Sequence, residues 1–108
     1  MKKGTLCLAD VPEGVGHEQK GKRPVVVVGE ANGLVTVIPL TTTLKRANFS
    51  HTEIIEPSRE NGLRKPSVAL VFQIKSLDLS RIDGQIGVLS SEDLKRIDAL
   101  LRDLLGLA

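Results

Sequence analysis

The chain has 108 residues, of which 41% are hydrophobic and 26% charged, which is typical of a folded domain and excludes a disordered or fibrous chain. The formal net charge of +2 is too small to indicate a nucleic-acid partner by itself. With two phenylalanines and no tyrosine or tryptophan, the sequence argues against RNA binding on aromatic stacking platforms, so any contact with nucleic acid should rely on charge and hydrogen bonds.

The first predicted element is a strand over Thr5–Ala9. It contains Cys7, the only cysteine of the chain, so no intramolecular disulfide can form. Because Cys7 alternates with leucines in an apolar run, we expect a buried structural thiol. Residues 10–23 follow as a long polar loop, because they include a proline and three glycines.

The next two elements are predicted to form a β-hairpin. Pro24–Val28 is a run of β-branched residues behind a proline, which is typical of a strand buried on both faces. Residues 29–33 form the turn, with Asn32-Gly33 as a common hairpin signal, and Leu34–Leu40 returns as the partner strand.

The second half of the chain contains shorter predicted elements. Two segments are expected to be loops: residues 41–48 because they are polar and basic, and residues 56–66 because they contain two prolines, a glycine and several charges. Strands are predicted over Thr52–Ile55, Ser67–Ile74 and Gln85–Leu89, and one helical turn over Asp78–Arg81.

The last element is the clearest. Ser90 is placed to cap a helix N-terminus, with Asp93 at the capping-box position, and Gly106 stands where a helix terminator belongs. Between them, apolar residues recur at spacings of three and four, so one face should pack on the sheet. Several short strands followed by one helix predict a single domain over residues 1–108, mainly β, built as a partly closed antiparallel barrel with both long loops at its rim.

Basic residues gather in three apparent loops. They can be solvated loop charges, or they can converge on one groove that would suit a polyanion. The three groups are Lys20, Lys22 and Arg23; Lys45 and Arg46; and Arg59, Arg64 and Lys65.

Familiar catalytic motifs do not occur in the sequence. Its two histidines, His17 and His51, are far apart and no cysteine pair exists, so no metal site is expected. It has no Gly-x-Ser-x-Gly motif, no Gly-x-Gly-x-x-Gly motif and no Walker loop, so neither a nucleophile-elbow hydrolase nor a nucleotide cofactor is expected. No signal peptide or membrane-spanning run is recognisable, which predicts a cytoplasmic protein without membrane contact.

Five segments resemble the MazF/PemK toxin family in their order and spacing. The most specific is GHEQKGKRPVVVV over residues 16–28, where the family pattern is Gly-Ser-Glu-Gln-x-Gly-x-Arg-Pro followed by an apolar strand. Together the segments cover essentially the whole chain. The others are Lys3-Gly4 with Asp10-x-Pro12, LVTVIPLT over residues 34–41, SVALVFQIKSLD over residues 67–78, and Ile86-Gly-x-Leu-Ser90 with the terminal helix.

This resemblance implies an SH3-like barrel with a terminal helix, which works as a homodimer and without a cofactor. It also implies a sequence-specific endoribonuclease that cuts single-stranded RNA without a metal. The resemblance further implies inhibition by a cognate antitoxin, whose acidic, disordered tail folds into the RNA groove. Metal-free cleavage proceeds by attack of the ribose 2′-hydroxyl on phosphorus, which yields a 2′,3′-cyclic phosphate and a 5′-hydroxyl. Such an enzyme removes one proton, stabilises an extra negative charge and assists the leaving oxygen.

Three residues of the family pattern are the predicted catalytic groups. Arg23 stands directly before the apolar strand, and its guanidinium can stabilise phosphate charge or donate a proton to the leaving oxygen; a plain surface arginine is the alternative. Thr41 ends the partner strand and can bond a phosphoryl oxygen or merely cap the backbone, with Thr42 and Thr43 as neighbouring candidates. Glu18 can act as the base for the 2′-hydroxyl, or it can orient Arg23 through a salt bridge.

Other positions are expected to influence how the substrate is bound. His17 replaces the usual serine of the family and either assists proton transfer or is simply exposed. Phe72 stands where the family has an acidic residue, and the turn at residues 29–33 is shorter than the usual insertion, so both changes bear on the RNA sequence that is recognised. Predicted substrate contacts, with a solvated surface position as the alternative for each, are Gln19, Lys22, Thr42, Lys45 and Gln73.

Two other functions fit the same sequence. A gyrase-poisoning toxin would use the same fold, because fold does not determine function. The retained Glu18, Arg23 and Thr41 favour the nuclease over this alternative. The other alternative is a catalytically silent RNA-binding or regulatory domain, in which changes such as Phe72 have removed the activity.

Overall fold

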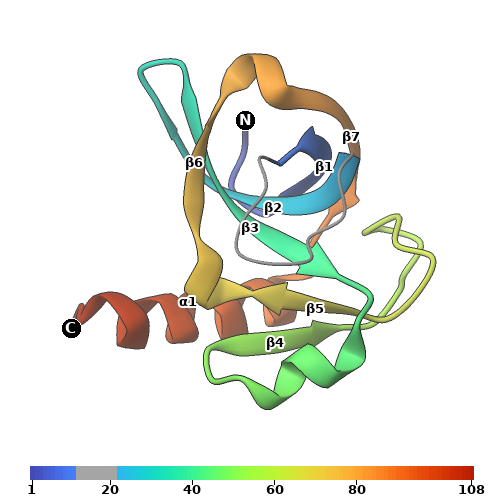
Figure 1. Ribbon diagram of the computed structural model, residues 1–108, viewed down its shortest axis with the longest axis vertical. Coiled ribbons are helices and arrows are strands. Elements are labelled where there is room, and N and C mark those ends of the chain that lie inside the picture. Colours follow the sequence, from blue (N-terminus) through green and yellow to red (C-terminus); the bar gives the residue numbers. More distant parts are fainter. Residues whose placement is uncertain (12–21) are drawn as a thin grey trace.

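The computed structural model describes residues 1–11 and 22–108, which fold mainly into β-strands with an α-helix at the C-terminal end (Figure 1). None of the helices in these residues is both long and apolar enough to span a bilayer. The strands are β1 (Thr5–Asp10), β2 (Lys22–Ala31), β3 (Leu34–Thr41), β4 (Thr52–Ile55), β5 (Ser67–Leu70), β6 (Lys75–Asp78) and β7 (Ile82–Val88). The helical elements are the 3₁₀ turns η1 (Leu44–Asn48), η2 (Val71–Gln73) and η3 (Leu79–Arg81), and the α-helix α1 (Ser91–Leu105).

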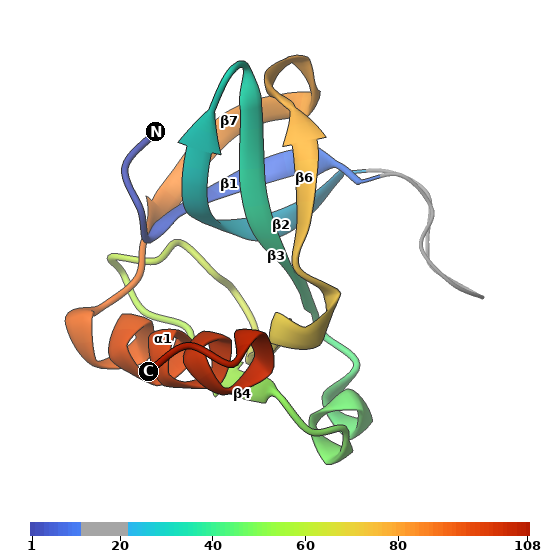
Figure 2. The same ribbon diagram turned by 90° about the vertical axis from the view of Figure 1, so that its left-hand side faces the viewer.

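The strands form one antiparallel sheet in the order β4-β5-β3-β2-β1-β7, with β6 also paired to β3. The sheet curls on itself, and α1 lies below the curled part as a separate layer (Figures 1 and 2). The predicted partly closed antiparallel barrel with a C-terminal helix is therefore confirmed.

The β2–β3 hairpin extends further than predicted. Asn32 and Gly33 form its tip with φ of +56° and +80°, values that asparagine and glycine tolerate better than other residues. Pairing reaches Ala31 and Leu34, so part of the predicted turn at residues 29–33 belongs to β2. The register shifts by one residue between Val27 and Gly29, which makes Val28 a β-bulge.

The predicted strand over Ser67–Ile74 is wrong in its second half. β5 and β6 both pair with the same edge of β3, and η2 separates them. The register on β3 differs by three residues across η2, because this turn inserts three residues that have no partner on β3. The apolar pattern did not reveal the break, because Val71 is buried like a strand residue.

Two other predicted boundaries need correction, and one element is confirmed. The predicted loop at residues 41–48 contains η1, and the last strand begins at Ile82 rather than at Gln85. The predicted helical turn over Asp78–Arg81 is present as η3, capped by the Asp78 carboxylate, which accepts a hydrogen bond from the Ser80 N–H at 2.9 Å. This bond lowers the pKa of Asp78.

Strand β2 is buried on both faces, as predicted. Val26 belongs to a core cluster that also includes Ile38 and Ile97 of α1. Val25 and Val27 belong to a second cluster inside the curl. The members of this inner cluster are Cys7, Ala9, Val25, Val27, Val35, Val37 and Leu77. Cys7 is fully buried, and burial raises the pKa of its thiol, as expected of a structural cysteine.

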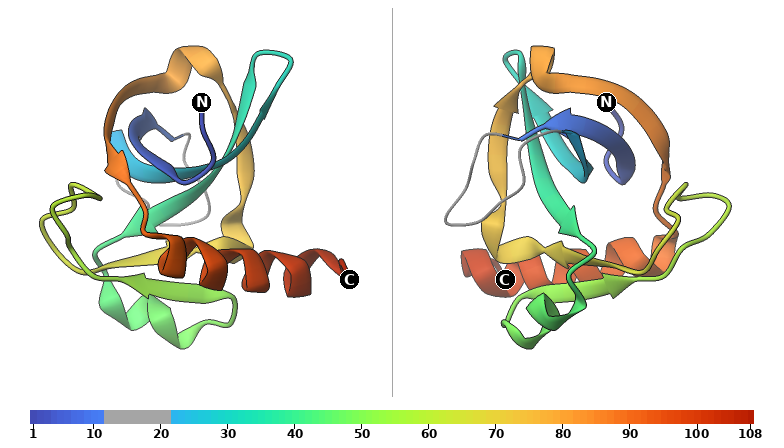
Figure 3. Two further views of the ribbon diagram at one scale, coloured as in Figure 1. Left: turned by 180° about the vertical axis from the view of Figure 1, so that it is seen from behind. Right: turned by 45° about the vertical axis from the view of Figure 1, so that its right-hand side comes forward.

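Helix α1 begins and ends as predicted. The Ser90 hydroxyl accepts the Asp93 N–H at 3.1 Å, and Gly106 adopts φ of +69° at the C-cap. Ile97 is buried on the first core cluster, with the helix lying along β4 and β5 (Figure 3). Two polar contacts join α1 to the start of β4: Arg96 with Glu53 at 2.8 Å and His51 with Asp103 at 2.7 Å.

The predicted loop at residues 56–66 is built around Asn61, which is 2% exposed. Its Oδ1 accepts the N–H groups of Ser58 and Leu63 at 3.0 and 2.9 Å, and its Nδ2 donates to the Glu56 carbonyl at 2.9 Å. The loop also lies directly against β7, since a Cβ on Gly87 would come within 2.4 Å of the Asn61 carbonyl carbon. One buried amide therefore fixes a long charged loop on the barrel.

We predict that Asn61→Ala lowers the free energy of unfolding by about 2–4 kcal/mol, because two part-buried N–H groups and one carbonyl lose their partner. Urea unfolding followed by circular dichroism measures this change. The exposed Asn48 provides the matched control, with an expected effect within about 0.5 kcal/mol for Asn48→Ala. Equal unfolding midpoints for the two variants would contradict the role given to Asn61.

Candidate functional site

The ladder of β1, β2 and β3 sets Arg23 and Thr41 level with each other. Arg23 is paired with Ala9, and Val25 is paired with Pro39. Continuing the second register by two residues places Arg23 opposite Thr41. Because side chains alternate along a strand, Arg23 lies on the face of Val25, which is the face of the inner core. Arg23 and Thr41 therefore share the inner face of adjacent strands at one end of the core.

The hydroxyl of Thr41 has one bond to the backbone. Its Oγ1 accepts the N–H of Thr43 at 3.2 Å, and the side chain is half-buried. A hydroxyl has one donor and two acceptor sites, so this bond orients the oxygen and leaves its proton able to donate to a ligand. The capping role considered for Thr41 is therefore real, and it is compatible with a contact to a phosphoryl oxygen.

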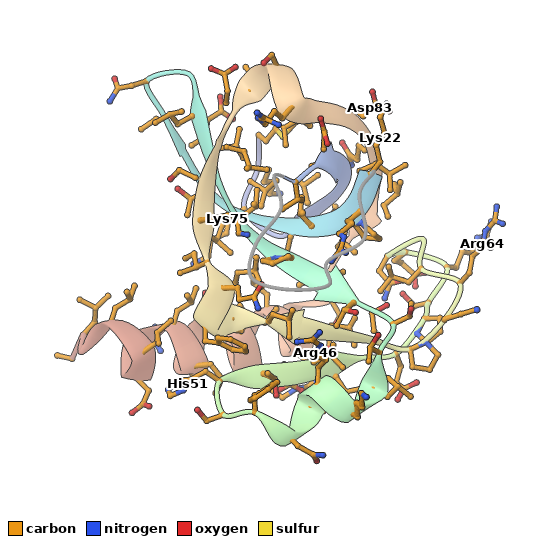
Figure 4. The ribbon with its side chains drawn as sticks, viewed as in Figure 1. Lys22, Arg46, His51, Arg64, Lys75 and Asp83 are labelled. Atoms are coloured by element: carbon orange, nitrogen blue, oxygen red, sulfur yellow. The ribbon has the colours of Figure 1, made fainter. Side chains whose placement is uncertain are left out.

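Lys75 is a residue that sequence reasoning missed. It opens β6 and is paired with Val37 of β3, so it belongs to the inner face as well. It is half-buried, and its side chain points from β6 toward the inside of the curled sheet (Figure 4). The spacing of Lys75 two residues before buried Leu77 could have indicated the inner face, but only if the start of β6 at Lys75 had been known.

Lys22 does not share this face. It precedes Arg23 on the strand and is paired with Asp10, so its side chain lies on the opposite side of the sheet. There it forms an ion pair with Asp83 of β7 at 2.7 Å, which Figure 4 shows at the edge of the barrel. Arg81 contacts Asp10 nearby at 3.6 Å. Any substrate that reaches Lys22 has to compete with Asp83.

The other predicted site residues are spread over several elements. Thr42 is exposed directly after β3, Lys45 is exposed in η1, and Gln73 is half-buried at the end of η2. Predicted residues His17, Glu18 and Gln19 lie outside the described residues, as does Lys20 of the first basic group. Arg23 and Thr41 come level when the register of β2 and β3 is extended, and the roles of all these residues stay predictions.

The three basic groups do not all face the same way. Arg46 rises from η1 across the ribbons of β4 and β5, whereas Arg64 points outward from the loop at residues 56–66, away from both Arg46 and Lys22 (Figure 4). In residues 1–11 and 22–108, no three side chains of histidine, cysteine, aspartate or glutamate form a group that could hold a metal ion. The chemistry available on the inner face is thus a guanidinium, a hydroxyl and an ammonium, which suit a phosphate group.

Comparison with known proteins gives consistent relatives over the whole chain. The family model of the "PemK-like, MazF-like toxin of type II toxin-antitoxin system" matches residues 2–105. The chain is similar to the endoribonuclease MazF of Staphylococcus saprophyticus, with 34% identity over 113 residues that cover 99% of this chain and 92% of the relative.

Solved structures show the same fold. The MazF structure (Form-I) from Deinococcus radiodurans matches with a TM-score of 0.79 and 27% identity, covering 99% of this chain and 97% of the other. A MazE–MazF structure (Form-II) from the same organism matches with a TM-score of 0.74 and 26% identity, covering 100% and 97% of the two chains.

We predict that Asp83→Asn raises the affinity for single-stranded RNA up to about 5-fold at low salt, because Lys22 loses its competing carboxylate and a surface ion pair is worth less than about 1 kcal/mol. Fluorescence anisotropy of a labelled oligonucleotide measures the dissociation constant at two salt concentrations. Asp98→Asn is the matched control, because it frees Lys3 from an exposed pair of 2.9 Å beside α1. An equal gain in both variants would show a general charge effect instead.

Proposed function

This chain belongs to the family of PemK-like, MazF-like toxins of type II toxin–antitoxin systems, and we propose that it is an endoribonuclease that cuts single-stranded RNA at specific short sequences without a metal ion. The proposal is supported by the pairing of Arg23 with Ala9 and of Val25 with Pro39, because this register, extended by two residues, puts Arg23 level with Thr41 on one face. The name of the Staphylococcus saprophyticus relative, which includes the word endoribonuclease, supports the same activity.

In the proposed reaction, the ribose 2′-oxygen forms a bond to the adjacent phosphorus while the bond from phosphorus to the 5′-oxygen breaks. The 2′-hydroxyl gives its proton to a base, and the leaving 5′-oxygen receives one. The products are a 2′,3′-cyclic phosphate and a 5′-hydroxyl. Negative charge accumulates on the phosphoryl oxygens between these two events, so fixed donors at that point lower the barrier.

Arg23 supplies the main donor for this charge. A guanidinium offers a planar fork that matches two phosphate oxygens, and it stays charged at any physiological pH, which makes it a poor base. The pairing of Arg23 with Ala9 fixes its backbone in β2, so the side chain starts from a defined position before the substrate arrives. Arg23 can also donate to the leaving 5′-oxygen. Thr41 donates its hydroxyl proton to a phosphoryl oxygen, and Lys75 adds positive charge from the next strand.

Glu18 is the proposed base for the 2′-hydroxyl or, alternatively, the group that orients Arg23. Gln19, Thr42, Lys45 and Gln73 are the proposed substrate contacts, with Lys22 joining them once it leaves Asp83. These assignments rest on the family pattern and on the positions of the matching residues in this sequence.

The proposed partners follow from the family. A cognate antitoxin with an acidic tail would block the basic inner face, and the MazE–MazF structure from Deinococcus radiodurans supports such a complex. We further propose that the toxin acts as a homodimer in the cytoplasm, where its messenger RNA substrates are found.

We predict that the purified protein cuts a mixed single-stranded RNA in the presence of EDTA and that Arg23→Ala lowers the rate by at least about 100-fold, because the transition-state charge loses its main donor. Electrophoresis of end-labelled RNA measures the rate, and mapping of the termini identifies the products. Undiminished cleavage by Arg23→Ala would refute this mechanism, as would loss of activity in EDTA that zinc or magnesium restores.

The controls separate chemistry from folding. Arg23→Ala should keep the native circular dichroism spectrum, and Arg23→Lys should recover only part of the activity, because lysine keeps the charge but not the fork. Thr41→Ser keeps the hydroxyl that Thr41→Val removes, so the serine variant should be the more active of the two.

We predict that light scattering at micromolar concentration gives about twice the chain mass of 11.7 kDa. The isolated chain has exposed apolar side chains on several elements, such as Leu105 and Leu107 at the helix end, which a second copy can cover. A mass of one chain across the concentration range would contradict the homodimer.

A further inference from the structure

The only two aromatic residues of the chain meet on its surface. Phe49 and Phe72 are separated by 22 residues of sequence, yet their ring centroids are 5.7 Å apart with an angle of 58° between the planes. They remain 53% and 37% exposed. Two phenylalanines in a tilted pair normally form part of a core, so their exposure together requires an explanation.

Both rings are held by the backbone of short rigid elements. Phe49 is the C-cap residue that follows η1, where its N–H donates to the Arg46 carbonyl at 3.1 Å and its carbonyl accepts the Thr52 hydroxyl at 2.9 Å. Phe72 lies in η2, and its N–H donates to the His51 carbonyl at 3.3 Å. A preformed aromatic surface loses little conformational entropy when a ligand stacks on it.

The charges around the pair are suited to an anionic ligand. Lys45 and Arg46 lie in the last turn of η1, four and three residues before Phe49, and within the described residues no ion pair engages either of them. Of the acids that contact these elements, Glu53 is ion-paired with Arg96, and Asp103 is hydrogen-bonded to the His51 ring. The aromatic pair is therefore flanked by available positive charge.

The pair lies at the far end of β5 from the candidate site. Thr41 is paired with Val68, and Phe72 comes four residues later, which corresponds to roughly 10–13 Å along the chain. A strand of RNA whose phosphate lies at Arg23 and Thr41 can thus reach the pair with a nucleotide other than the one that reacts.

We propose that Phe49 and Phe72 form a stacking site for one nucleobase of single-stranded RNA, with Lys45 and Arg46 contacting the adjacent phosphates. The proposal rests on the proposed nuclease function and identifies a flanking contact that contributes to sequence preference. Base stacking on aromatic side chains together with a basic groove is a general mode of single-strand recognition. A protein partner for the same patch is the competing explanation, and the flanking cations favour RNA.

The test uses fully 2′-O-methylated oligonucleotides, each with one 2-aminopurine at a different position. These strands cannot be cut by attack of a 2′-hydroxyl, so binding is measured whether or not the protein is a nuclease. Emission of 2-aminopurine falls when the base stacks on an aromatic ring. The wild-type protein should quench one position more strongly than its neighbours.

The substitutions Phe49→Leu and Phe72→Leu keep apolar volume and remove the ring. Each should abolish this quenching and raise the dissociation constant about 5- to 100-fold, the range expected for loss of one stacked base. Leu79→Ala is the matched control, because Leu79 is 42% exposed on η3, and it should leave both quantities unchanged. Thermal unfolding checks that all variants are folded.

Wild-type quenching and affinity in both leucine variants would overturn the stacking site, and so would a failure of the wild-type protein to bind any of the oligonucleotides. Loss of the dimer mass in the variants with unchanged RNA binding would assign the patch to a protein contact and also overturn it. Cleavage of unmodified RNA is scored in parallel. A wild-type protein that quenches but does not cut refutes the nuclease and supports the stacking site.

Discussion

Val28 bulges out of the β2–β3 ladder, and this single extra residue decides which side chains of the two strands share a face. An unbroken ladder counted from the Asn32-Gly33 tip would place Arg23 opposite Thr42. With the bulge, Val25 lies opposite Pro39, and extending this register by two residues puts Arg23 level with Thr41. A shift of one residue exchanges the two faces of a strand, so the inner core and the candidate site depend on the same register.

Neighbouring residues of β2 have different surroundings because they lie on opposite faces. Lys22 joins β2 to β7 through Asp83, and Arg81 reaches Asp10 on the same outer side. These exposed pairs add little stability, but they give Lys22 and Arg81 a carboxylate partner on the outer side of the barrel. Arg23 lies on the inner side, beside Thr41 of the next strand and on the face that Lys75 shares. The inner face therefore carries the two cations Arg23 and Lys75, although the net charge of the chain is only +2.

The sequence predicted the features that depend on local pattern. The β-branched run of β2, the Asn32-Gly33 tip, and the helix from Ser90 to Gly106 each carry their own signal, and the structure confirms them. It could not predict the Val28 bulge, because a bulged valine and a paired valine look alike in a row of four. It could not predict that η2 interrupts the strand over Ser67–Ile74, because the interruption follows from pairing with β3. The Lys22–Asp83 pair joins residues 61 positions apart, so no spacing rule finds it.

Composition alone could not show that the two phenylalanines meet, and the backbone at His51 is part of what brings them together. Two phenylalanines are too few for a stacking platform by count, but the fold places them together. His51 has φ of +58°, a conformation that costs energy for a residue with a side chain and persists only when its surroundings fix it. Its carbonyl accepts the Phe72 N–H, while its ring contacts Asp103 near the end of α1. The same residue thus positions one ring of the pair and attaches the terminal helix to the sheet. A contact at the helix end can therefore act on the aromatic surface through His51, which gives the C-terminal helix a physical connection to the proposed stacking site.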